Sequence, residues 1–164
     1  MLNVYLPRDN NGCILSGWGS MATGASQSSD LQETNLNVFP QKFCNNSYNL
    51  RPSHPYKSEI DLVLPKLFQP DLLCAGSSSG GGSGSCLGDS GGPLVIHDKL
   101  ASPPRHVQIG VVQGGAGECG NKLYPGVYIR LDNYDVLDFI YRTAFGRSID
   151  SSSTSKNYII STST

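Results

Sequence analysis

The chain has 164 residues, with 19 glycines, 10 prolines and a formal net charge of −1. This length suits a single domain, and the near-neutral charge argues against nucleic acid or an anionic membrane as an electrostatic partner. No apolar run approaches the ~20 residues that a membrane-spanning helix needs. The stretch Met1–Leu6 lacks the basic start and the length of a signal peptide, so we expect none in this chain.

Short apolar segments separated by turn residues predict an all-β domain. Alternation of polar and apolar residues, as in 35–38 and 107–111, supports strands with one face buried. The expected strands are Asn3–Leu6, Gly12–Trp18, Leu31–Phe39, Leu72–Ala75, Pro93–His97, His106–Gln113 and Gly126–Leu131.

A single helix is expected near the end of the domain. Asp132 or Asn133 is suited to cap its N-terminus, apolar residues then recur at helical spacing, and Gly146 is suited to end it. Residues 147–164 are rich in Ser and Thr and are expected to be a disordered tail. The sequence thus predicts a domain over residues 1–146 followed by that tail.

The most informative segment is Gly88–Leu94, which reads Gly-Asp-Ser-Gly-Gly-Pro-Leu. A serine hydroxyl is a weak nucleophile, so it needs a nearby base and donors for a developing oxyanion. Glycines on both sides of Ser90 permit a sharp turn that leaves backbone N–H groups free. Gly-Asp-Ser-Gly alone is also ordinary turn composition, but the longer string followed by an apolar strand is more specific.

Other segments at suitable intervals strengthen this interpretation. They are Cys13-Ile-Leu-Ser-Gly-Trp-Gly19, Leu31–Val38, Cys74-Ala-Gly76, Pro125-Gly-Val-Tyr128 and Tyr134–Ala144. Together with Gly88–Leu94, they resemble the chymotrypsin- and trypsin-like serine proteases. The resemblance covers about residues 3–146 and only the C-terminal half of that catalytic domain. It implies a six-stranded antiparallel Greek-key barrel, the second barrel of a trypsin-like double-barrel fold, with a C-terminal helix.

The resemblance implies a role for each matching residue. Ser90 would be the catalytic nucleophile, and the N–H groups of Gly88 and Ser90 would form the oxyanion hole. Asp89 would pair with the amino terminus that zymogen cleavage releases; without that partner, we expect an unpaired carboxylate and a disordered turn. The substrate-binding residues would be Gly84, Gly115 and Gly126.

The five cysteines are an odd number, so at least one has no partner within the chain. The family pattern implies the disulfides Cys44–Cys74 and Cys86–Cys119. Cys13 is then left over, because its usual partner position holds Ile96. We expect Cys13 to be a small buried apolar residue.

No segment resembles the one that carries the family's histidine base. His54, His97 and His106 are expected on the surface, and because they are scattered and no Cys-x-x-Cys occurs, no metal site is expected. The resemblance implies no cofactor either.

Two functions therefore stay open. The chain is either part of a serine endopeptidase that lacks the His and Asp of the triad, or a non-catalytic protease-like binding protein. The segment 113–115 favours the second, because Gln113-Gly114-Gly115 stands where the family usually has Ser-Trp-Gly.

For an enzyme, the resemblance implies a secreted protein, a protein or peptide substrate, and a missing N-terminal half of the protease domain as partner. Gly84 lies at the base of the implied specificity pocket. Because it is uncharged, we expect cleavage after large apolar residues rather than after Arg or Lys. Asn45–Pro70 is longer than the matching family segment, and is either a contact near the cleft or an inert surface insertion.

Overall fold

The computed structural model describes residues 12–49, 71–146 and 148. The expected strand Asn3–Leu6, most of the insertion Asn45–Pro70, His54 and nearly all of the tail 147–164 lie outside the described residues. Those expectations therefore stay predictions.

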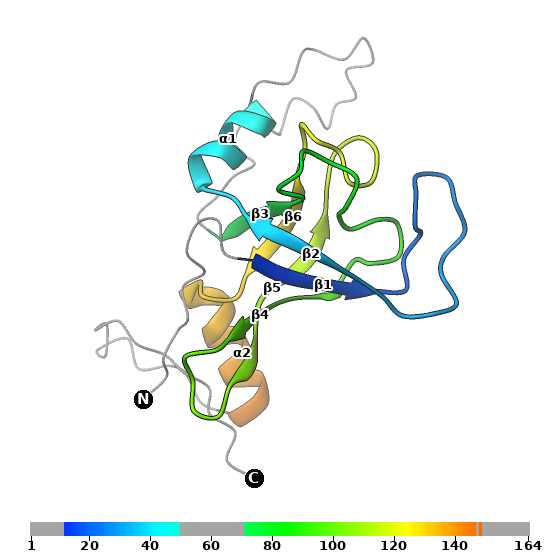
Figure 1. The fold of residues 1–164 in the computed structure, drawn as a ribbon. Coiled ribbons are helices and arrows are strands. Elements are labelled where there is room, and N and C mark those ends of the chain that lie inside the picture. Colours follow the sequence, from blue (N-terminus) through cyan, green and yellow to red (C-terminus); the bar gives the residue numbers. More distant parts are fainter. Residues whose placement is uncertain (1–11, 50–70, 147, 149–164) are drawn as a thin grey trace.

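A closed antiparallel barrel forms the body of the described chain (Figure 1). Its strands follow one another around the barrel in the order β1-β2-β3-β6-β5-β4, and β4 closes it against β1. The expectation of a six-stranded antiparallel barrel is confirmed. The strands are β1 (Gly12–Gly17), β2 (Gln32–Val38), β3 (Leu72–Gly76), β4 (Pro93–Asp98), β5 (Arg105–Gly114) and β6 (Gly126–Arg130).

Alternation along the strands places one set of side chains inside the barrel. In β4, for example, Leu94 and Ile96 are buried while His97 is exposed. The interior contains the buried residues Cys13, Leu15, Leu36, Val38, Leu73, Ala75, Leu94, Ile96, Ile109, Val112 and Tyr128. This core holds the rigid strands from which the loops of the candidate site extend.

One helix, α1 (Gln41–Asn49), was missed by the sequence analysis, which treated the segment from Asn45 as loop. Its residues are mostly weak helix formers, so local propensity gives little sign of it. Tertiary contacts hold it instead. Cys44 is bonded to Cys74 in β3, and the Tyr48 hydroxyl donates a hydrogen bond to the carbonyl of Pro125.

The C-terminal helix α2 (Tyr134–Phe145) is confirmed. Asn133 caps it by accepting hydrogen bonds from the N–H groups of Asp135 and Val136. Gly146 ends it in the left-handed conformation, with φ of 64°. Neither helix of the described ranges is long and apolar enough to cross a membrane.

Candidate active site

Ser90 lies exposed in a tight turn between β3 and β4. Two short backbone hydrogen bonds shape the turn, from Asp89 N–H to the Cys86 carbonyl (3.0 Å) and from Gly92 N–H to the Asp89 carbonyl (2.9 Å). Gly88 has φ of 99° and Gly91 has φ of 84°, conformations that favour glycine. The glycines on both sides of Ser90 are therefore required by the backbone itself.

The turn is fixed to its surroundings on two sides. Gly91 N–H donates to the Val112 carbonyl of β5 at 2.9 Å, and Ser20 N–H donates to the Leu87 carbonyl at 2.8 Å. Within the described residues, the N–H groups of Gly88 and Ser90 donate to no other group. The turn is thus anchored while these two donors stay free.

The Asp89 carboxylate is partly buried and is paired with backbone donors. Its Oδ1 accepts from Gly19 N–H at 2.8 Å, and its Oδ2 accepts from Cys86 N–H at 2.9 Å. Such bonds to a carboxylate offset much of the cost of removing it from water. The expectation of an unpaired Asp89 in a disordered turn was therefore wrong, because the backbone N–H groups of Gly19 and Cys86 pair with its two carboxylate oxygens.

Two glycines, one at the end of β1 and one in the β1–β2 connection, make room for this carboxylate. A Cβ on Gly19 would overlap it, lying 2.7 Å from Oδ2, and a Cβ on Gly17 would lie 3.1 Å from Cγ. The Gly17-Trp18-Gly19 motif is thus explained by close packing against Asp89. A single sequence gives no sign of this contact, since the two segments are far apart in the chain.

A cavity of about 180 Å³ lies beside Asp89. Gly84, the expected pocket base, lines it together with Asp89, Gly17, Gly19 and Gly120. A Cβ on Gly84 would lie 3.2 Å from the Cα of Gly120, so the two loops are in close contact there. No charged side chain other than Asp89 and Glu33 lines this cavity among the described residues.

The other two expected substrate-binding glycines lie next to each other. A Cβ on Gly115 would lie 3.8 Å from the Cα of Gly126. Gly126 in turn packs against the hydroxyl of Tyr128 and that of Ser85, at 2.9 and 3.2 Å from an added Cβ. Burial raises the pKa of Tyr128 above its ordinary value, so this phenol stays neutral. Gly115 and Gly126 are not among the residues that line the cavity at Gly84, so the pocket role of all three stays a prediction.

Both expected disulfides are present. Cys86–Cys119 connects the segment before Ser90 to the β5–β6 connection, and Cys44–Cys74 connects α1 to β3. Cys13 is a free thiol that is 2% exposed, and its Sγ donates to the Leu36 carbonyl at 3.4 Å. Burial raises the pKa of Cys13 to about 12, as expected for a small residue of the core.

Neither described histidine is near Ser90. His97 and His106 are cross-strand partners near the end of β4, and their rings stack with centroids 4.8 Å apart. The extended chain from Pro93 to His97 alone spans about 14 Å. Direct proton transfer needs a separation of about 3 Å, so within the described residues Ser90 has no histidine base.

A closed antiparallel barrel with an anchored Gly-Asp-Ser-Gly turn defines the chain as a protein of the trypsin-like serine protease fold. The family model described as Trypsin matches residues 3–140, and the chain belongs to this family. The chain is 38% identical over 123 residues to coagulation factor XII of Bos taurus. The aligned stretch covers 74% of this chain and 17% of that protein.

Other relatives agree. Human kallikrein-14 is 34% identical, covering 74% of this chain and 37% of the relative. The venom peptide isomerase heavy chain of Agelenopsis aperta is 36% identical, covering 72% and 42%. The solved structure of neuropsin, a serine protease of mouse brain, superposes with a TM-score of 0.62 at 28% identity, covering 87% of this chain and 52% of its own. The chain therefore spans less than half of these curated relatives and about half of that solved chain.

Proposed function

We propose that this chain is the nucleophile-bearing part of a secreted serine endopeptidase. The observation that carries the proposal is the turn at Ser90. Exposed Ser90 directly follows Gly88, which has a positive φ, and Asp89, whose carboxylate accepts two backbone N–H groups. The free N–H groups of Gly88 and Ser90 suit an oxyanion hole, because they can donate to a charged oxygen without first breaking another hydrogen bond.

In the proposed reaction, Ser90 Oγ forms a bond to the scissile carbonyl carbon while a base takes its proton. The C–N bond then breaks, and the amine leaves with that proton. Water hydrolyses the resulting ester and restores Ser90. The substrate is a protein or peptide, whose backbone would pair with Gly115 and whose side chain would lie near Gly84 and Gly126.

The base and its orienting aspartate would come from outside the described residues. Ser90 without a base stays a neutral alcohol at pH 7, and His97 and His106 are at the wrong end of β4. The partial coverage of the relatives is consistent with a second, His- and Asp-bearing part of the protease domain as partner.

Asp89 would serve as the partner of a new amino terminus. Its carboxylate oxygens each accept one bond and can accept more, and the adjoining cavity leaves space for an ammonium group. Secretion is supported by the two disulfides, because such bonds persist in oxidising compartments.

A non-catalytic binding protein is the second candidate. It is favoured by Gly114, which has φ of 154° and carries no side chain where the family usually has a tryptophan wall. Such a protein would keep the turn at Ser90 as a structural feature only.

Labelling with a fluorophosphonate probe tests the choice. We expect the refolded chain alone to label slowly, since loss of a triad histidine costs about 10⁶-fold in subtilisin. Fusion to the His- and Asp-bearing barrel of human kallikrein-14 should produce fast labelling of Ser90 that Ser90→Ala abolishes.

The matched control is the same kallikrein barrel fused to its own second half. If that control labels fast and the chimera, though folded, does not, the endopeptidase proposal fails and the binding protein is favoured. Fast labelling of the chain alone would contradict the absence of a base.

A further inference from the structure

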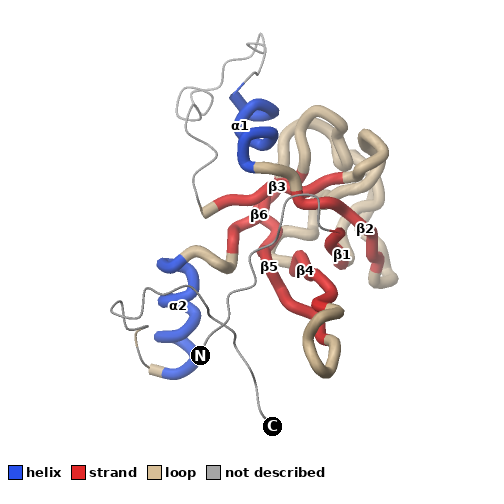
Figure 2. The backbone as a smooth tube through the Cα atoms, turned by 60° about the vertical axis from the view of Figure 1, so that its left-hand side comes forward, coloured by secondary structure: helices blue, strands red, loops and turns tan. Residues whose placement is uncertain are grey.

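The β4–β5 hairpin places two imidazoles side by side on the outer surface of the barrel. His97 and His106 are direct cross-strand partners, both are exposed, and their rings stack at 4.8 Å with an interplanar angle of 23°. In Figures 1 and 2, the connection between these strands projects from the end of the barrel opposite α1. The sequence analysis expected no metal site because the histidines are scattered; strand pairing brings these two together.

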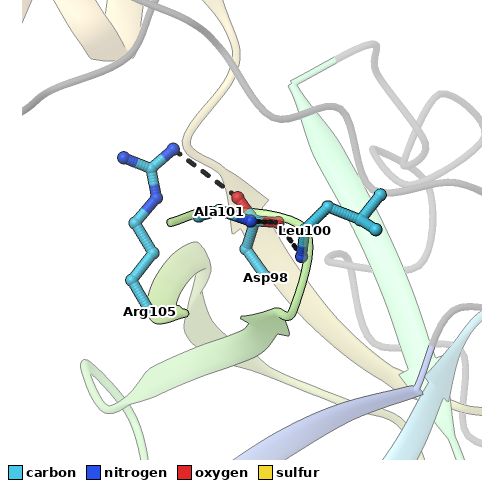
Figure 3. A network of polar contacts seen from close by, with 4 residues as sticks. All are labelled: Asp98, Leu100, Ala101 and Arg105. Carbon is cyan, nitrogen blue, oxygen red and sulfur yellow. Dashed lines mark hydrogen bonds and ion pairs between the residues drawn. The ribbon is translucent and has the colours of Figure 1, made fainter. Parts of the chain in front are cut away.

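The end of the hairpin is held in place directly beyond the pair. Asp98 accepts hydrogen bonds from the N–H groups of Leu100 and Ala101, both at 3.2 Å, and pairs with Arg105 at 3.5 Å (Figure 3). Because Asp98 follows His97 and Arg105 precedes His106, this network fixes the register in which the imidazoles face each other. A fixed register reduces the entropy lost when both rings bind one ligand.

We propose that His97 and His106 form a two-imidazole site for a borderline divalent transition metal ion, such as Cu²⁺ or Zn²⁺. Imidazole nitrogen suits these ions, and Cu²⁺ binds most tightly along the first-row series. With metal–nitrogen bonds of about 2.0–2.1 Å at a tetrahedral angle, the two nitrogens must lie about 3.3 Å apart. The ring centroids are 4.8 Å apart, so the exposed edges of the two rings would have to tilt towards each other for both nitrogens to reach one ion.

The surroundings determine which charges the ion meets. Asp98 and Arg105 lie one residue along each strand, where alternation directs side chains to the opposite face, and Asp98 is already paired. Val95 and Gln108, the next outer pair, carry no charge. No group of three or more metal-binding side chains occurs in the described ranges, so water would complete the coordination.

The site is separate from the candidate active site. About 14 Å of extended strand divides His97 from the turn at Ser90, so metal binding should not require an active protease. Metal binding should instead stabilise the β4–β5 hairpin, because an ion that bridges the two strands binds only when they are paired in the folded register.

Titration of the full, disulfide-bonded chain with Cu²⁺, followed by calorimetry and electron paramagnetic resonance, tests the proposal. We expect one ion per chain with two equatorial nitrogens in the spectrum at neutral pH. His97→Gln and His106→Gln should each weaken binding at least about tenfold, or about 1.4 kcal/mol, and the spectrum should lose one nitrogen.

His54→Gln is the matched control and should leave binding unchanged. Urea unfolding without metal shows whether each variant is folded. If a variant is not folded, nuclear magnetic resonance of the unmodified chain tests the site instead, because substoichiometric Cu²⁺ should broaden the ring protons of both His97 and His106. Unchanged binding in folded His97→Gln or His106→Gln, or ring protons that do not broaden together, would overturn the proposal.

Discussion

Individual residues of the site are explained by small, specific contacts. Asp89 is the clearest case, since its two carboxylate oxygens each accept a backbone N–H and thereby connect the Ser90 turn to the β1–β2 connection. Cys13 is the opposite case: its thiol faces the core, has one weak hydrogen bond and takes no part in the site. At this scale, chemistry follows from what each side chain contacts.

The buried Cys13 thiol should make stability depend on alkaline pH. Its pKa is raised from 9.0 to about 12 in the folded chain, so above pH 9 the unfolded thiol ionises while the folded one does not. The free energy of unfolding should therefore fall by up to about 1.4 kcal/mol per pH unit from pH 9 towards 12. No such fall should occur below pH 9.

Urea unfolding of the unmodified chain and of Cys13→Ala, measured from pH 7.5 to 10.5, checks this. The difference between the two proteins cancels other titrating groups. Short unfolding times prevent the ionised thiol from exchanging with the disulfides. A difference that does not change across this range would show that Cys13 is not protected by burial.

Elements and loops are coupled where the sequence shows no local reason for contact. The β1–β2 connection, the segment around Ser90 and the β5–β6 connection meet at Asp89, at Cys119 and along the cavity. α1 likewise depends on β3 and β6 through its disulfide and Tyr48. The geometry at Ser90 is thus a property of several loops together.

Gly19→Ala should break this coupling. The added methyl group would overlap the Asp89 carboxylate, and overpacking of this kind costs about 1–3 kcal/mol. Urea unfolding should show that loss, and labelling of Ser90 in the kallikrein fusion should fall with it.

Gly12→Ala is the matched control, because a Cβ at Gly12 meets nothing within 4 Å in the described structure. It should change stability by less than about 0.5 kcal/mol. If Gly19→Ala proves as stable as Gly12→Ala, Asp89 is not packed as the structure has it.

At the scale of the whole molecule, the described chain is one barrel with the loops of the candidate site on one side and the β4–β5 hairpin at another end (Figure 2). Ser90 and the N–H groups of its turn belong to this barrel, whereas neither of the described histidines, His97 and His106, lies near Ser90. Catalysis would therefore be a property of the barrel together with its partner.

A reconstituted enzyme should cleave after Phe, Tyr or Leu rather than after Arg or Lys. Gly84 provides no carboxylate at the expected base of the pocket to pair with a cation, so we expect large apolar side chains to be favoured through buried area. Profiling the active kallikrein fusion on a peptide library checks this. Gly84→Asp should shift the preference towards Arg and Lys, and a dominant Arg preference in the unmodified fusion, which exposed Glu118 could cause, would contradict the prediction.

The sequence by itself determined the strands, the capped α2 and the glycine-rich turn at Ser90 through local signals: alternation in strands, Asn133 and Gly146 at the helix ends, and glycines where φ is positive. Its motifs also indicated the family, and that resemblance implied the six-stranded barrel and both disulfides. Tertiary structure alone decided the formation of α1, the pairing of Asp89 with Gly19, and the meeting of His97 with His106. Each of these depends on residues brought together by barrel closure and strand register, and contacts between distant segments leave no pattern in a single sequence.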